Sequence, residues 1–137
     1  MVNTTSTKIW ANVGVKDLKR TADFYTKLGF KSNMSQESDD LTSFLFGKDN
    51  FVIHFFRREK LEATMKEKLA DLKDGYEVMF TLSAGSEEEV RNWAKTAEEA
   101  GGTVFMQPGA DENGFFYCGF ADPDGHKFNV LLLPPKM

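Results

Sequence analysis

Cysteine is nearly absent from this chain, because Cys118 is the single cysteine among its 137 residues. One thiol excludes an internal disulfide and favours a reducing compartment. Long apolar runs are also missing, since no stretch approaches the roughly 20 residues that a bilayer crossing needs. The first residues carry neither the basic region nor the apolar region of a secretory signal. We therefore expect a cytoplasmic protein without a membrane partner.

A concentrated basic face is the next feature that the sequence lacks. Lysine and arginine number 17 against 21 aspartate and glutamate residues, and the net charge is −4. Both signs are interspersed, whereas a nucleic-acid partner demands clustered positive charge. What the chain does contain is 41% hydrophobic residues, including 13 phenylalanines. These can fill the core of a single domain over residues 1–137.

The stretch 114–133 predicts a β-hairpin, because a four-residue turn separates two apolar strands. Asp122 can accept hydrogen bonds from its neighbouring backbone, and Pro123 fixes φ at the first central position. Gly125 permits the positive φ that lets the chain leave the turn. Pro134 and Pro135 lack backbone donors, so we expect the second strand to stop there.

The first half of the chain reads as strand, helix and three further strands. Asp17 is a predicted helix N-cap, and Gly29 follows Leu28 as a left-handed helix end. The expected elements are a strand at 8–15, a helix at 17–28, and extended runs at 30–36, 41–47 and 50–57.

The second half repeats this order. Ser86 and Glu89 form a capping box that opens a helix, and Gly101 ends it after Ala100. The expected elements are a strand at 76–83, a helix at 86–100, and extended runs at 103–107, 114–121 and 126–133. The repeat lies in the order of elements rather than in the letters, and it predicts an α+β protein made of two βαβββ modules.

Residues 58–74 join the two modules, which we place at about 8–57 and 75–133. The segment is charged, and four apolar residues are spaced to share one helix face: Leu61, Met65, Leu69 and Leu72. We expect a solvated connecting helix that lays this stripe on the domain. A lid over a cleft or a dimer contact is the alternative, since connections of this length are often functional.

Two segments carry a resemblance to a known family: residues 12–30, which run from Asn-Val-Gly-Val-Lys-Asp-Leu to Leu-Gly-Phe, and the Asp122-Pro-Asp-Gly-His126 turn. Both resemble the vicinal oxygen chelate superfamily, which includes glyoxalase I, bleomycin-resistance proteins, fosfomycin-inactivating transferases and extradiol dioxygenases. The resemblance covers nearly the whole chain. It implies two βαβββ modules that curl into an incomplete barrel, with helices outside and a ligand cleft on the concave inside. It also implies a homodimer.

In that superfamily, four metal-ligand positions lie on the first and last strand of each module. Side chains alternate between the two faces of a strand, so parity separates packed positions from those that face the cleft. The apolar positions that we expect to pack are Ile9, Ala11, Val13, Val15, Phe51, Ile53, Phe55, Val78, Phe80, Leu82, Phe128, Val130 and Leu132. The positions that we expect to face the cleft are Trp10, Asn12, Val52, His54, Phe56, Glu77, Met79, Thr81, Lys127, Asn129 and Leu131.

The quartet that aligns with the metal ligands is Trp10 or Asn12, His54, Glu77 and Asn129. The metal-dependent members of the family use His and Glu at these places, because imidazole and carboxylate are strong donors to Zn, Ni, Mn or Fe. Tryptophan cannot bind a metal, and an asparagine carbonyl suits hard cations at best. His54 and Glu77 remain as metal ligands, which is too few for a tight site. We expect no cofactor, and a divalent metal (Zn, Ni or Mn) is the alternative.

Two functions stay open. The first is the binding of a small organic ligand in an aromatic concave cleft formed by Trp10, Asn12, His54, Phe56, Glu77, Met79, Lys127 and Asn129. The second is a divalent-metal-dependent lyase or isomerase that resembles glyoxalase I, in which Glu77 serves as metal ligand or catalytic proton shuttle. The missing metal donors favour the first function.

Three residues also have purely structural interpretations. His54 is either a functional cleft residue or a wall histidine paired with Glu77, and that pairing would raise its pKa. His126 lies on the packed parity of its strand, so we expect it to hydrogen-bond the turn. Cys118 lies in an aromatic strand, and we expect it to be a buried small hydrophobe.

Overall fold

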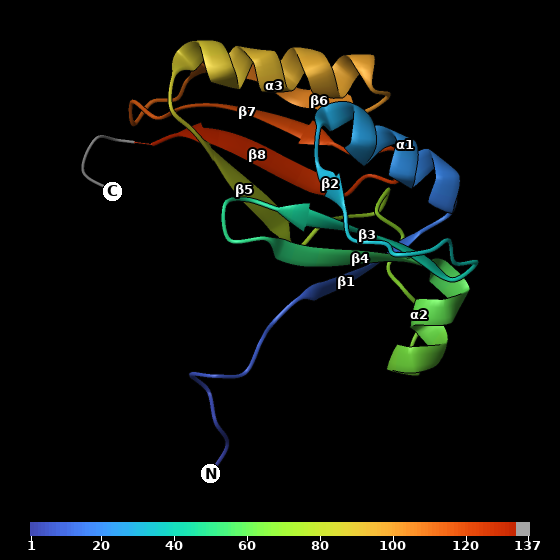
Figure 1. The fold of residues 1–137 in the computed structure, drawn as a ribbon. Helices are drawn as coiled ribbons and strands as arrows, with labels where there is room; N and C mark the ends of the chain where they lie inside the picture. Colours follow the sequence, from blue (N-terminus) through green and yellow to red (C-terminus); the bar gives the residue numbers. More distant parts are fainter. Residues whose placement is uncertain (134–137) are drawn as a thin grey trace. The chain divides into compact units, whose positions relative to one another are not determined.

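The computed structural model describes residues 1–133 of the chain (Figure 1). Pro134 and Pro135, which we expected to end the last strand, lie outside the described residues. The chain groups into two compact units that interleave along the sequence. Unit 1 consists of residues 1–18 and 30–69, and unit 2 consists of residues 19–29 together with the chain from residue 70 onward. Among residues 1–133, the helices are all too short or too polar to span a bilayer.

Unit 1 contains a four-stranded sheet and one short helix. Its elements are β1 (Ala11–Val15), β2 (Lys31–Ser32), β3 (Leu41–Phe46), β4 (Phe51–Arg57) and α2 (Arg58–Met65). The strand order is β1-β4-β3-β2, with β1 parallel to β4 and the other pairs antiparallel. Phe44 pairs with Ile53 in the β3–β4 ladder, and both are buried with Phe55 on one face of the sheet. That face forms the core of unit 1.

Unit 2 repeats this sheet with a second set of strands. Its elements are α1 (Leu18–Leu28, grouped with this unit from Lys19), β5 (Met79–Ala84), α3 (Glu87–Glu99), β6 (Thr103–Ala110), β7 (Phe116–Ala121) and β8 (Lys127–Leu132). The strand order is β5-β8-β7-β6, with β5 parallel to β8 and the other pairs antiparallel. The predicted duplication of βαβββ modules is therefore confirmed.

Both helices of unit 2 cover the same face of its sheet (Figure 1). Phe24 of α1 and Trp93 of α3 each lie 6.3 Å, ring centre to ring centre, from Phe120 of β7. Phe120 in turn stacks on Phe128 of β8 at 5.2 Å. Phe24, Phe120 and Phe128 are all at most 1% exposed. Since burying one such side chain contributes about 1.5 to 3 kcal/mol, this aromatic cluster is a principal source of stability in unit 2.

The ends of α1 and α3 lie where the sequence predicts them. Gly29 and Gly101 have φ of 101° and 103°, the left-handed conformation expected directly after each helix. Ser86 accepts a hydrogen bond from the Glu89 backbone N–H at 3.1 Å, as the capping box requires. The Glu89 carboxylate in turn accepts the N–H of Gly85. These signals are local, which is why the sequence alone could place them.

The predicted helix over 58–74 is wrong beyond its first half. Helix α2 ends at Met65, and Lys66 takes a left-handed φ of 59°. The Glu62 carboxylate accepts the backbone N–H of Leu69 at 2.9 Å. Leu69 then packs against Gly14, where an added Cβ would lie 2.3 Å from the leucine Cδ1. The chain folds back, so the four apolar residues do not share one helix face, and Met65 is 56% exposed.

Three residues predicted to pack are instead exposed: Ile9 at 81%, Phe51 at 37% and Val78 at 64%. Each lies at or beyond the end of a strand ladder. Strand β1 begins only at Ala11, and β5 begins only at Met79, because its parallel partner β8 begins at Lys127. Without a neighbouring strand and a covering helix, alternation no longer decides which side chain is buried.

Candidate functional site

The candidate site lies on the face of the unit 2 sheet opposite its helices. Phe128 and Val130 of β8 are buried on the helix side. The alternate residues of the same strand, Lys127, Asn129 and Leu131, therefore point to the other side, as their parity predicted. Strand β8 pairs with β5 and β7, so this face is continuous across the three strands.

A cavity of about 530 Å³ opens on this face. Its lining is mostly aromatic and sulfur-containing, and consists of Met79, Phe105, Met106, Asp111, Phe115, Tyr117, Asn129 and Leu131. Strands β5 to β8 all contribute, and the loop between β6 and β7 supplies Asp111 and Phe115. The volume falls within the range that holds drug-sized ligands.

Gly119 makes room for one wall of the cavity. It pairs with Asn129 in the β7–β8 ladder and carries no side chain above the sheet. A Cβ at this position would lie 2.4 Å from Cζ of Phe105. The Phe105 ring can lie across the strand only because this position is glycine.

Two polar groups are fixed within the lining. The Thr81 hydroxyl donates to the Asn129 amide oxygen at 2.6 Å, which fixes the amide and leaves its N–H₂ group as a donor. Asp111 Oδ1 accepts the backbone N–H groups of Asn113 and Phe115, at 2.9 and 3.0 Å. The aspartate thus holds the β6–β7 loop with one oxygen, and its second oxygen keeps acceptor capacity.

Lys127 lies beside the cavity rather than in its lining. Its ammonium is held between two rings, 4.2 Å from the centre of Tyr76 and 4.3 Å from the centre of Phe105. Such cation–π contacts typically contribute about 0.5 to 1 kcal/mol at exposed sites. Lys127 therefore helps to hold the Phe105 ring in position at the edge of the cavity.

The predicted cleft residues of unit 1 lie together on its own sheet. Asn12 pairs with His54 in the β1–β4 ladder, and the Trp10 and Phe56 rings contact His54 edge-on at 6.2 and 5.9 Å. His54 Nδ1 shares a 2.7 Å hydrogen bond with the buried Ser43 hydroxyl. Burial lowers the pKa of His54, whereas the pairing with Glu77, one of the two alternatives, would have raised it.

Glu77 lies just outside the strand in which we placed it. Strand β5 begins at Met79, and Glu77 is exposed in the segment before it. Of the predicted site residues, the cavity lining includes Met79 and Asn129, and Lys127 borders it. Trp10, Asn12, His54 and Phe56 belong to unit 1, and Glu77 is not part of the lining.

Sequence reasoning missed most of the cavity wall. Leu131 had the predicted parity but was left out of the ligand cleft, and the other missed residues are Phe105, Met106, Asp111, Phe115 and Tyr117. They come from β6, β7 and the loop between them. The signal that could have found them is the run of aromatic residues around 115–117 beside an Asx turn at Asp111.

The side chains present do not fit a catalytic metal centre. No three His, Cys, Asp or Glu residues within 1–133 gather into a group that could hold a metal ion. The amide oxygen of Asn129, the atom that would face a metal, already accepts the Thr81 hydroxyl. A transition-metal site usually needs three protein donors.

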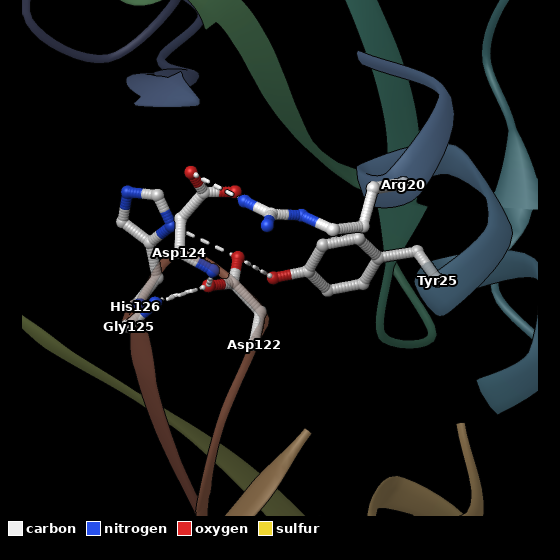
Figure 2. A network of polar contacts seen from close by, with 6 residues as sticks. All are labelled: Arg20, Tyr25, Asp122, Asp124, Gly125 and His126. Atoms are coloured by element: carbon white, nitrogen blue, oxygen red, sulfur yellow. Dashed lines mark hydrogen bonds and ion pairs between the residues drawn. The ribbon is translucent and has the colours of Figure 1, made fainter. Parts of the chain in front are cut away.

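The turn between β7 and β8 is a polar network with a structural role (Figure 2). Asp122 Oδ1 accepts the backbone N–H groups of Asp124, Gly125 and His126, all at 2.9 to 3.0 Å. Its second oxygen accepts the Tyr25 hydroxyl at 2.8 Å and lies 2.9 Å from His126 Nδ1. The predicted hairpin, the Asx turn and the structural hydrogen bond of His126 are all confirmed.

Burial also explains two weakly acidic groups of unit 2. It raises the pKa of Tyr25 well above its ordinary value, and the neighbouring Asp122 carboxylate raises it further. Burial raises the pKa of Cys118 to about 11, and its thiol lies 3.5 Å from the Val90 carbonyl oxygen. Cys118 is therefore an inert packed thiol at neutral pH, as predicted.

Comparison with known proteins agrees with this architecture. A hypothetical protein from S. aureus is 31% identical, with a TM-score of 0.82 over 92% of this chain and 93% of that one. A glyoxalase-related enzyme from Fulvimarina pelagi is 19% identical, with a TM-score of 0.82 over 94% and 89% of the two chains. A lactoylglutathione lyase from Agrobacterium tumefaciens is 18% identical, with a TM-score of 0.65 over 95% and 96%. The last two likenesses show the fold alone.

No curated protein matches the chain in sequence. The family model described as Glyoxalase/Bleomycin resistance protein/Dioxygenase superfamily matches residues 9–130, which is most of the chain. The match spans both βαβββ modules and includes the Asp122 turn. The chain therefore belongs to the Glyoxalase/Bleomycin resistance protein/Dioxygenase superfamily.

Proposed function

We propose that this protein binds a small organic ligand in the cavity of unit 2, without a catalytic metal. The observation that supports this most strongly is the composition of the lining. Three aromatic rings and two methionines line the space, with Asn129 and Asp111 among its polar groups. Apolar walls with a few fixed polar groups are typical of small-molecule sites.

The walls suit a planar or branched apolar group. Phe105, Phe115 and Tyr117 offer ring surfaces, and the flexible thioethers of Met79 and Met106 adapt to irregular shapes. The Asn129 amide N–H₂ group can donate to a carbonyl or hydroxyl on the ligand. Apolar burial would then supply the affinity, and the amide would orient the molecule.

A metal-dependent lyase or isomerase of the glyoxalase I kind has less support. That chemistry needs a metal held by several strong donors, and the described residues provide no such group. Glu77, the residue that we considered as a proton shuttle, is exposed and lies outside the cavity lining. The proposed function therefore contains no metal-assisted step.

Methionine methyl NMR tests the proposal. The chain has six methionines, of which Met79 and Met106 line the cavity, whereas Met65 is exposed on α2. A library of small aromatic compounds should include binders that shift the methyl signals of Met79 and Met106 and leave Met65 unchanged. Binding that shifts Met65 instead, or no binder in the library, would contradict the proposal.

A variant that fills the cavity tests whether the ligand binds inside it. Leu131→Trp adds a large ring inside the cavity and should abolish binding by occupying its volume. Leu133→Trp is the matched control, because Leu133 lies two residues further along the chain, is exposed and does not line the cavity. Equal loss of binding in both variants would place the ligand elsewhere.

A further inference from the structure

We propose that the ligand of this cavity is an organic cation, an ammonium or similar group attached to an apolar or aromatic body. This inference rests on the proposed function and specifies its ligand class. It follows from the charge of the cavity, from the fixed position of one carboxylate in its loop and from the chemistry of the walls.

Asp111 provides the charge. Among the described residues that line the cavity, it is the one that carries a carboxylate, and Lys, Arg and His do not occur in the lining. The loop fixes its position, because Oδ1 accepts two backbone N–H groups. A carboxylate that is partly buried and already held in place loses little side-chain entropy when it pairs with a cation.

The walls provide the second contribution. Aromatic ring faces carry negative charge density, and a cation positioned over them within about 6 Å is attracted. Three rings line this cavity, Phe105, Phe115 and Tyr117, and Phe105 already holds the Lys127 ammonium. A carboxylate beside several rings is the arrangement that recognises quaternary and other organic ammonium groups.

Lys127 shows that this sheet face already stabilises one ammonium. Its Nζ lies between the Tyr76 and Phe105 rings and not in the cavity lining. An anionic ligand would need Lys127 to leave both rings and turn into the cavity. A cationic ligand can contact Asp111 and the aromatic rings without any movement of Lys127, so the structure favours a cation.

A charge series of matched probes tests the inference. Benzyltrimethylammonium is the cation, neopentylbenzene is its neutral isostere, and phenylacetate is the anion. Binding of each is measured by titration with the methyl signals of Met79 and Met106 as reporters. We expect the order of affinity to be cation, then neutral compound, then anion.

Two variants of the loop between β6 and β7 test whether Asp111 causes the preference for the cation. Asp111→Asn removes the charge and keeps the Oδ1 acceptor that holds the loop. It should weaken cation binding by about fivefold, the ordinary strength of one ion pair, and leave the neutral probe unchanged. Glu112→Gln is the control, because Glu112 is exposed on the same loop and lies outside the lining. It should leave the binding of all three probes unchanged.

The outcomes separate the two proposals. If the neutral probe binds as tightly as the cation, or if Asp111→Asn leaves cation binding intact, the cation inference is wrong and ligand binding stands. Tighter binding of phenylacetate would assign the site to anions and to Lys127. If none of the three probes perturbs Met79 and Met106, the cavity is not an apolar ligand site and both proposals fall.

Discussion

At the scale of single residues, Asp122 is the polar side chain that organises the hairpin turn through its hydrogen bonds. It is 2% exposed, and its carboxylate receives three backbone N–H groups together with Tyr25 and His126. A buried carboxylate is tolerated only when it is hydrogen-bonded in this way. The fold of unit 2 therefore depends on each of these donors.

Tyr25→Phe tests that dependence. The variant removes one hydroxyl and leaves the buried carboxylate with one donor fewer, so we expect a loss of about 1.5 to 3 kcal/mol in the free energy of unfolding. Urea titration followed by circular dichroism measures it. Tyr76→Phe is the control, because Tyr76 is 48% exposed and keeps its ring over Lys127. Equal stability of the two variants would show that the Tyr25 hydroxyl contributes nothing.

His54 makes stability depend on pH with a definite sign. Burial lowers its pKa in the folded protein below 6.5, so below about pH 6.5 the unfolded chain binds a proton that the folded protein resists. The free energy of unfolding should therefore fall as the pH falls from about 6.5 toward the folded pKa. His54→Gln should flatten this dependence, as measured by urea titrations between pH 7 and 5. An unchanged slope would contradict the assignment to His54.

At the scale of elements, the two helix ends at Gly29 and Gly101 are the clearest targets. Both have positive φ, and an added Cβ would meet nothing within 4 Å, so any cost comes from the backbone alone. Gly29→Val or Gly101→Val should lower the free energy of unfolding by about 1 to 2 kcal/mol. Thermal unfolding of each variant gives the value.

Gly75→Val is the matched control for these glycines. Gly75 has no positive φ and an equally open surrounding space, so its substitution should be close to neutral. If all three variants lose the same stability, the cost belongs to the valine side chain and not to the left-handed backbone.

Which elements the sequence could predict depends on how local their determinants are. The ends of α1 and α3, the capping box at Ser86 and the Asp122 turn rest on residues a few positions apart, and these were predicted. The start of β5 depends on where its parallel partner β8 begins, and the end of α2 depends on Leu69 packing against Gly14. These are tertiary contacts, so periodicity alone missed them.

The candidate site follows the same division. Parity placed Met79 and Asn129 on the face that lines the cavity, because alternation is a local property of a strand. The aromatic wall was missed, because Phe105 reaches its place by lying over Gly119 of the neighbouring strand. The alternation of residues along β6 does not reveal that the Phe105 ring lies over the neighbouring strand.

At the scale of the whole molecule, we expect a homodimer, which the family resemblance implied. Several large apolar side chains outside the cavity lining are exposed, among them Ile9, Trp10 and Val78. Burying such residues between two copies would remove apolar surface from water. Light scattering at micromolar concentration should give about twice the chain mass of 15.5 kDa. A mass of one chain, unchanged up to high concentration, would contradict the expectation.

Helix α1 belongs to the first half of the sequence, yet its Tyr25 bonds a turn that lies 97 residues further along the chain. A ribosome adds about 5 to 20 residues per second, so α1 is synthesised roughly 5 to 20 seconds before Asp122. Throughout that time Phe24 and Tyr25 have no sheet to cover. The aromatic residues of α1 therefore lack the strands that cover them in the folded protein until the last hairpin is made.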